Sequence, residues 1–212
     1  MHPFDAGAAA REPGMGLLAA SGSGSSGSDS GSGSGGSGSG SGGLGILVGN
    51  TRALWPRFTA ALARPELAAD SNPLDRYTEE TIGAAFPGAR IYFGHRRYGG
   101  AFLPLQRLAV ATGLGALAPS HLVIHPVYGP WFALRAVVLV DAAAAPPVRP
   151  PIAQPCQCGP ACAGALAAAL DARGPGAWRA WLGVRDACAL RGHRYSEDQI
   201  RYHYLRVWPA RS

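Results

Sequence analysis

Residues 125–141 read HPVYGPWFALRAVVLVD, a turn-forming segment followed by an apolar run. The aromatic and β-branched residues of 131–141 are typical of a strand. Residues 126–130 contain two prolines and a glycine, which suit a wide hairpin loop. The strand at 131–141 is therefore predicted to follow a strand at 121–125 through this loop, which makes at least one pairing of the sheet antiparallel.

Hydrophobic patterns predict further elements before this segment. LGILVGN at residues 44–50 is a short apolar run typical of a buried strand, and RIYFGH at 90–95 is a second β-rich run. Helices are predicted at 51–64, at 75–86 and at 103–112, where Gly113 marks the end of the helix.

The chain after residue 141 is predicted to be helical, apart from an irregular proline-rich segment at 142–155. An alanine-rich helix is expected at 160–172. The last helix begins at the N-cap Ser196, and Gln199 is placed to complete a capping box. A few strands with helices interspersed predict an α+β fold with a mainly antiparallel sheet flanked by helices.

A tract of glycine and serine at residues 21–43 interrupts the chain. Such a composition behaves as a flexible coil and contributes nothing to a core. We therefore expect an N-terminal segment at 1–20, a disordered insertion at 21–43 and a single domain at 44–212, with order beginning at Leu44.

Composition and charge restrict the classes of function. Hydrophobic residues make up 47% of the chain and charged residues 15%, which is typical of a globular protein. The net charge of +6 comes from scattered arginines, so nucleic-acid binding is not expected. Arg135, Asp141 and two prolines interrupt the longest apolar stretch, so no membrane span is expected. Charged residues near the N-terminus argue against a secretory signal, and we expect a cytoplasmic protein.

Three segments resemble the cyanocobalamin reductase family of the cblC type. They are residues 46–75, with ILVGNT and NPLD at their ends; residues 125–139, HPVYGPWFALRAVVL; and residues 178–197, with WRAW, RDA and RYSE. In addition, AVATGLG at 109–115 followed by PVYG at 126–129 is similar to epoxyqueuosine reductases and reductive dehalogenases. Both resemblances imply a nitroreductase-like cobalamin-binding domain.

A corrin ring is a broad, mostly apolar disc, and it requires apolar walls with a few polar partners. Gly113 and Gly115 suit such a site because a residue without a Cβ lets the backbone approach a flat ligand, although a helix C-cap also explains Gly113. The cblC resemblance implies that further positions face the corrin: Leu105, Gln106, Leu117, Pro119, Ser120, Val123, Ile124 and Leu134. For the aliphatic members of this set, an ordinary place in the core is the alternative.

Two arginines are the candidate catalytic residues. The resemblance implies that Arg135 and Arg185 bind the carboxylates of glutathione, whose thiolate would remove alkyl groups from cobalamin. Planar guanidinium groups suit carboxylates well. The structural alternative is that Arg135, which interrupts an apolar strand, pairs with Asp186 or Asp141 inside the fold.

The chain has no Asp-x-His-x-x-Gly pattern that would supply a histidine as the lower axial ligand of cobalt. A cobalt that loses its lower ligand accepts an electron more readily, which favours reductive loss of cyanide. His125 is either a cobalt ligand or a structural histidine at a strand end.

Cys156, Cys158, Cys162 and Cys188 leave three alternatives open: ordinary thiols, a zinc site or an iron–sulfur cluster. The spacing of the first three departs from the C-x2-C-x2-C-x3-C pattern of such clusters. This departure counts against a built-in cluster, and no residue is assigned as a metal ligand.

The predicted function is reductive decyanation of cyanocobalamin or glutathione-dependent dealkylation of alkylcobalamins, with the cobalamin then passed to a downstream trafficking protein. The resemblance implies a reduced flavin, FMN or FAD, as the electron donor. The alternatives are an epoxyqueuosine reductase-like enzyme and a cobalamin carrier without catalytic activity.

Overall fold

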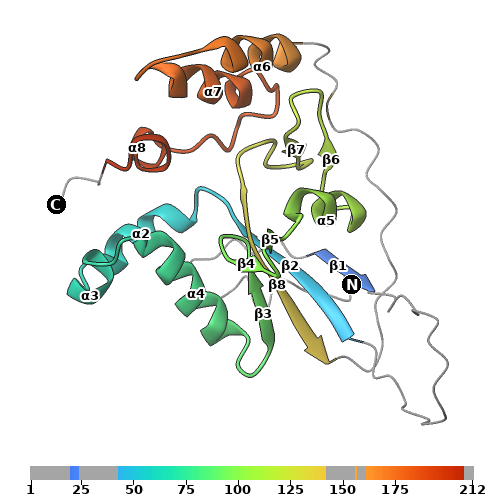
Figure 1. Cartoon of the computed structure of the whole chain (residues 1–212), viewed down its shortest axis with the longest axis vertical. Helices are drawn as coiled ribbons and strands as arrows, with labels where there is room; N and C mark the ends of the chain where they lie inside the picture. Colours follow the sequence, from blue (N-terminus) through green and yellow to red (C-terminus); the bar gives the residue numbers. More distant parts are fainter. Residues whose placement is uncertain (1–19, 24–42, 142–155, 157–160, 208–212) are drawn as a thin grey trace.

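A four-stranded antiparallel sheet with the strand order β1-β2-β8-β3 lies at the centre of the protein (Figure 1). The computed structural model describes residues 20–23, 43–141, 156 and 161–207. The strands of this sheet are β1 (Ala20–Ser23), β2 (Gly43–Asn50), β3 (Arg90–Phe93) and β8 (Ala133–Asp141). The predicted α+β class with an antiparallel sheet is confirmed.

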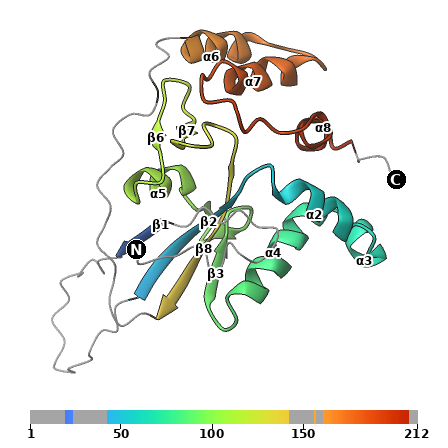
Figure 2. The same ribbon diagram turned by 180° about the vertical axis from the view of Figure 1, so that it is seen from behind.

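Helices and two short hairpins surround the sheet. The helices are α2 (Leu54–Ala61), α3 (Pro65–Ala68), α4 (Pro73–Ala85), α5 (Leu105–Ala111), α6 (Ala161–Asp171), α7 (Ala177–Asp186) and α8 (Glu197–Leu205). The hairpins are β4 (Arg97–Tyr98) with β5 (Ala101–Phe102), and β6 (Ala116–Leu117) with β7 (Val123–Ile124). In both views α6 and α7 lie side by side at one end of the molecule, beyond the β6–β7 hairpin (Figures 1 and 2). None of the described helices is long and apolar enough to span a bilayer.

Successive residues of β2 are buried on opposite faces of the sheet. Ile46 and Val48 pack with Phe58 of α2 and Ile82 of α4 on one face. Leu47 packs on the opposite face with residues that include Ala109, Leu114 and Phe132. Residues 44–50 are apolar at consecutive positions because both faces of β2 are covered.

The predicted hairpin between residues 121–125 and 131–141 is wrong. Val123 and Ile124 form β7, which pairs with β6, whereas β8 pairs with β2 and β3. Only one bridge, between His125 and Gly129, forms in the described loop. The chain then turns so that Trp131 is fully buried against α7 and α8 instead of continuing a ladder.

Two other expectations are corrected. Order was expected from Leu44, but residues 20–23 form β1, an edge strand that pairs with β2, at the start of the glycine–serine tract. Residues 24–42 of that tract lie outside the described part of the chain. Helix α7, which the sequence analysis treated only as motif residues, packs against α6.

Candidate functional site

An apolar cleft opens between α5, the β6–β7 hairpin and the start of β8. Its volume is about 270 Å³. Its lining is mostly aliphatic or aromatic, with one amide and one guanidinium: Leu105, Gln106, Leu122, Val123, Pro130, Phe132, Ala133, Leu134 and Arg185. Apolar walls with few polar groups suit an apolar ligand whose orientation is fixed by those groups.

This apolar cleft brings together part of the predicted site. The predicted residues that line it are Leu105, Gln106, Val123, Leu134 and Arg185. The Gln106 Nε2 donates a hydrogen bond to the carbonyl oxygen of His121 at 3.2 Å, which joins α5 to the turn of the β6–β7 hairpin. Gln106 is thus the one amide among the residues that line the cleft.

Other predicted residues belong to the β6–β7 hairpin but not to the cleft lining. Leu117 is 47% exposed and Pro119 is also exposed, whereas Ser120 is buried. Ile124 is buried against Ala118 and Cys188, in a small cluster of its own.

The two glycines have roles within the fold. Gly113, with a φ of 68°, follows the C-cap of α5. The N–H of Gly113 donates to Val110 and the N–H of Leu114 donates to Ala109, which is the Schellman arrangement. At Gly115, a Cβ would lie 2.6 Å from the carbonyl oxygen of Ile124. Close packing of the β6–β7 hairpin therefore accounts for Gly115, which the C-cap explanation left open.

A β-bulge in β8 determines where Arg135 points. Val48 of β2 pairs with Ala136, but the next residue, Gly49, pairs with Leu134. Arg135 is therefore the additional residue of the bulge, and a bulge redirects the side chain that it carries. As a result Leu134 lines the apolar cleft while Arg135 lines a separate pocket beside α4 and α8.

The partners of Arg135 differ from those predicted. Its Nε donates to the Oδ1 of the buried Asn50 at 2.5 Å, and its Nη1 lies 3.8 Å from the Oδ1 of Asp75. Asp186 pairs with Arg194 at 2.8 Å instead, and the side chain of Asp141 lies outside the described part of the structure. Burial lowers the pKa of Arg135, and the nearby Asp75 opposes this effect.

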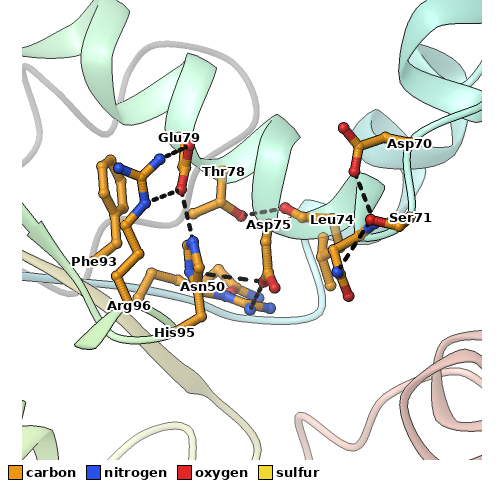
Figure 3. A network of polar contacts seen from close by, with 12 residues as sticks. Asn50, Asp70, Ser71, Leu74, Asp75, Thr78, Glu79, Phe93, His95 and Arg96 are labelled. Carbon is orange, nitrogen blue, oxygen red and sulfur yellow. Dashed lines mark hydrogen bonds and ion pairs between the residues drawn. The ribbon is translucent and has the colours of Figure 1, made fainter. Parts of the chain in front are cut away.

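A polar network holds Asp75 and α4 against the turn after β3 (Figure 3). Glu79, one helical turn after Asp75, accepts hydrogen bonds from Arg96 at 2.8 and 2.6 Å. The Nε2 of His95 lies 2.7 Å from Glu79, and its Nδ1 lies 3.9 Å from Asp75. The network therefore fixes the position of α4 relative to the turn after β3, the strand that pairs with β8.

The pocket beside Arg135 has a volume of about 110 Å³ and is predominantly polar. We call it the polar pocket, and its lining residues are Asn72, Leu74, Asp75, Arg135, Tyr202, His203 and Arg206. The Nη2 of Arg135 is buried without a hydrogen-bond partner in the described structure. Sequence reasoning gave no site role to four of these residues. Asn72 and Asp75 lie in the NPLD segment of the resemblance, which was used only to recognise the family, and His203 and Arg206 lie near the end of α8 without a motif.

Tyr195 and His203 lie near both arginines. The Tyr195 ring packs against Trp131 and His203, with centroid distances of 5.4 and 5.7 Å. Burial raises the pKa of Tyr195, and the charges of Arg185 and Arg135 oppose the rise. Burial and the charges of the same arginines lower the pKa of His203 to about 4, so it is neutral at physiological pH. Arg185 itself donates to the carbonyl oxygen of Pro130 at the edge of the apolar cleft.

His125 has a structural role in the loop before β8. Its Nδ1 accepts hydrogen bonds from the N–H groups of Val127 and Tyr128, at 3.0 and 3.2 Å. Burial lowers the pKa of His125 to about 4, so the ring is neutral and its proton resides on Nε2. A protonated Nε2 and an occupied Nδ1 leave no lone pair for a metal, which favours the structural alternative.

Two of the four cysteines lie at buried positions in the described part of the chain. Cys162 is buried in α6, and Cys188 is buried beside the β6–β7 hairpin. Cys158 lies outside the described part of the chain. Among the described residues, no group of three or more His, Cys, Asp or Glu side chains is arranged to hold a metal ion.

Comparison with solved structures supports the fold, whereas comparison of sequences finds no match. No family model matches the sequence, and no curated protein sequence matches it. The structure is similar to the crystal structure of a C. elegans B12-trafficking protein, CblC, described as a homologue of human MMACHC. The TM-score is 0.50 and the sequence identity 15%, over 76% of this chain and 74% of that chain. The cblC resemblance in the sequence is thus confirmed at the level of the fold: this chain has a CblC-like fold.

Proposed function

We propose that this protein binds cobalamin at the apolar cleft, removes its upper axial ligand and passes the cobalamin on. One observation carries the proposal. The cleft gathers Leu105, Gln106, Val123 and Leu134, which the cblC resemblance assigns to the corrin, in a fold similar to that of a B12-trafficking protein.

The size of the cleft constrains how cobalamin binds. Pockets that enclose a drug-sized ligand have volumes of about 300–1,000 Å³. The apolar cleft, at about 270 Å³, is smaller, and cobalamin is larger than such ligands. The corrin therefore inserts one edge into the cleft and rests its face against the β6–β7 hairpin, where Leu117 is exposed.

Decyanation is the first proposed reaction. One electron from a reduced flavin converts Co(III) to Co(II), the cobalt–carbon bond breaks, and cyanide leaves with the bonding pair. His125, whose ring lies against Phe132 of the cleft, supports this reaction by not coordinating cobalt. Cobalt without a lower donor is more easily reduced, because it loses the electron density that stabilised the higher oxidation state.

Dealkylation is the second proposed reaction. The glutathione thiolate attacks the alkyl carbon, a thioether forms, and the electron pair of the cobalt–carbon bond remains on cobalt as Co(I). Arg135 and Arg185 each bind one of the two carboxylates of glutathione. The arginines line different pockets, so the peptide extends from one pocket to the other.

An absorbance titration with cyanocobalamin tests the proposal. We expect a spectral shift on binding and co-elution of the vitamin with the protein in gel filtration. Gln106→Trp should fill the cleft and weaken binding at least about tenfold, which corresponds to about 1.4 kcal/mol. Arg107→Trp, at the next exposed position of α5 and outside the cleft lining, is the control and should bind like the wild type. A wild-type protein that neither shifts the spectrum nor retains the vitamin rules the proposal out.

A cobalamin carrier without catalysis is the second candidate function, favoured by the trafficking role of the similar protein. Reduced flavin distinguishes the two functions. A catalyst releases cyanide from bound cyanocobalamin, whereas a carrier displaces the lower base but retains cyanide.

A further inference from the structure

The stretch of chain between Glu80 and Asp141 contains no Asp or Glu. It folds into β3, the β4–β5 hairpin, α5, the β6–β7 hairpin and β8. These elements and the loops between them supply every residue that lines the apolar cleft except Arg185. The stretch carries five arginines, so all of its formal charges at neutral pH are positive.

The arginines of this stretch differ in whether their charge is compensated. Arg96 binds Glu79 through two hydrogen bonds, and the side chain of Arg135 is largely buried. The remaining members are exposed and make no ion pair with any residue that the structure describes: Arg90, Arg97 and Arg107. The surface around the cleft therefore has positive charge without matching carboxylates.

The β4–β5 hairpin presents an aromatic ring beside one of these free cations. Phe102 is 52% exposed, and the guanidinium of Arg97, its partner across the hairpin, lies 4.7 Å from the ring centroid. The hydroxyl of Tyr98 accepts a hydrogen bond from the N–H of Phe93 at 2.7 Å. The Tyr98 ring also packs against Tyr92, with a centroid distance of 5.1 Å. These contacts attach the hairpin to β3, so Phe102 is exposed on a firmly held element.

The hairpin adjoins the apolar cleft. Leu103 and Pro104 connect β5 to α5, and the first residue of α5, Leu105, lines the cleft. The three residues from Phe102 to Leu105 span at most about 11 Å even in a fully extended chain. A molecule that docks on Phe102 therefore lies beside the wall of the cleft.

The side chains of the hairpin suit a protein partner. An aromatic ring next to an arginine is a combination that protein interfaces use as an anchor. One exposed Phe is ordinary on any protein surface. Here, however, the ring lies beside Arg97, which has no carboxylate partner in the described structure, within a stretch of chain that has no acidic residue. Complementary charge across an interface then favours a partner that is acidic.

Nucleic acid and anionic membranes suit this surface less well. Both present rows of phosphates, and the segments that bind anionic lipid carry about four to eight Lys or Arg. The hairpin and α5 offer only Arg97 and Arg107 as exposed cations without an ion pair in the described structure. A protein instead supplies a few carboxylates together with an apolar side chain for Phe102.

We propose that Phe102 and Arg97 are the centre of a docking surface for an acidic protein partner. An apolar side chain of the partner packs on the exposed part of the Phe102 ring, and its carboxylates pair with Arg97 and, at the rim, with Arg107. The consequence that such a partner receives cobalamin from the neighbouring cleft rests on the proposed function, whereas the docking itself does not.

Selection from a random peptide library displayed on phage tests the proposal, with the full chain and without cobalamin. The library is first depleted on the double variant Phe102→Ser, Arg97→Gln and then selected on the wild type, so that the retained peptides require this surface. We expect these peptides to be rich in Asp and Glu around an apolar or aromatic residue. Measured by fluorescence anisotropy, a synthetic copy should bind Phe102→Ser at least about tenfold more weakly than the wild type, and Arg97→Gln about threefold more weakly.

Leu170→Ser and Arg179→Gln are the matched controls. Leu170 of α6 is 55% exposed, and Arg179 of α7 lies over the Trp178 ring at 4.6 Å, so the pair offers the same chemistry on other elements. Both variants should bind the peptide like the wild type. Added salt should weaken binding to the wild type more than binding to Arg97→Gln, because salt screens the charge that the variant lacks.

Several results would overturn the proposal. These are an absence of retained peptides, retained peptides without an excess of acidic residues, and equal losses of binding in the controls. A polythymidine oligonucleotide and phosphatidylglycerol vesicles represent the other polyanions. If either bound the wild type more tightly than the double variant, the surface would belong to nucleic acid or lipid and the proposal would also fail. Because cobalamin is absent, none of these results affects the cyanocobalamin titration, and the two proposals can fail separately.

Discussion

Gly129 lies in the loop before β8, where its backbone meets that of Leu190. A Cβ at Gly129 would lie 1.8 Å from the carbonyl oxygen of Leu190, and its φ of 57° is in the left-handed region. Gly129→Ala is therefore expected to lower the free energy of unfolding by about 2–4 kcal/mol, because the two segments must separate. Urea denaturation followed by circular dichroism measures this change.

Gly83 provides the control for this prediction. It lies within α4, and a Cβ there would meet no atom within 4 Å. Gly83→Ala should stabilise the protein by up to about 1 kcal/mol, because alanine favours the helix. A Gly129→Ala variant as stable as the wild type would show that the contact with Leu190 is not formed.

Arg135 illustrates how far a residue can be interpreted from its neighbours in sequence. An arginine within an apolar strand indicates that a polar partner is present, and this was correct. The identity of the partner depends on the bulge opposite Val48 and Gly49, which turns the side chain toward Asn50 and Asp75. No local pattern specifies a bulge, because it results from the pairing of strands distant in sequence.

Helix α8 is the element that its sequence defines most completely. The Ser196 Oγ accepts a hydrogen bond from the N–H of Gln199 at 3.3 Å, as the predicted N-cap requires. The capping box is wrong, because the Gln199 Oε1 is buried without a hydrogen-bond partner in the described structure. Tyr195 and Ile200, which flank this cap, pack in the same core cluster and form a hydrophobic staple. Cap and staple together fix where the chain enters α8, and α8 carries Tyr202 and His203 to the polar pocket.

Ser196→Ala should reduce the free energy of unfolding by about 1 kcal/mol, because it removes the acceptor for the first turn of α8. Ser196→Asp retains an acceptor and adds a favourable charge at the helix N-terminus, so it should be close to the wild type. Thermal and urea denaturation compare the three proteins. If Ser196→Asp were as unstable as Ser196→Ala, the cap would not be the cause.

The wrong hairpin shows where prediction of elements failed. Residues 121–125 and 131–141 both favour strands, and the loop between them has a suitable length. However, β8 pairs with β2 and β3, whereas β7 pairs with β6. Burial of Trp131 against α7 and α8 turns the chain away from β7. Local propensity therefore identified a strand but not its partner, which long-range burial decides.

Two histidines make the stability of the protein depend on pH. The pKa values of His125 and His203 are lowered by burial from the ordinary 6.5 to about 4. Between these values the unfolded chain binds more protons than the folded chain, so stability falls as the pH decreases from 6.5 to 4 and is fully present above 6.5. Urea denaturation at pH 7, 5 and 4 should show this loss.

His125→Asn separates the contribution of His125. An asparagine oxygen can still accept from the N–H groups of Val127 and Tyr128, but it does not titrate in this range. The loss of stability between pH 7 and 4 should therefore be smaller than in the wild type. His121→Asn is the control, because His121 is an exposed histidine with a φ of 58°, a conformation that asparagine tolerates. Equal pH dependence in His125→Asn and the wild type would contradict the prediction.

Local sequence specified the strands at 44–50 and 131–141, most helix positions and the cap of α8, because these depend on periodicity and on neighbours within one turn. The cblC resemblance, and not local sequence, named Leu105, Gln106, Val123 and Leu134, which line the apolar cleft. Strand pairing and helix packing decided the direction of the Arg135 side chain and placed Arg135 and Arg185 in two different pockets. They also brought together Asn72, Asp75, His203 and Arg206. These features bring together residues far apart in the chain, and the burial energy that selects them is a property of the folded state.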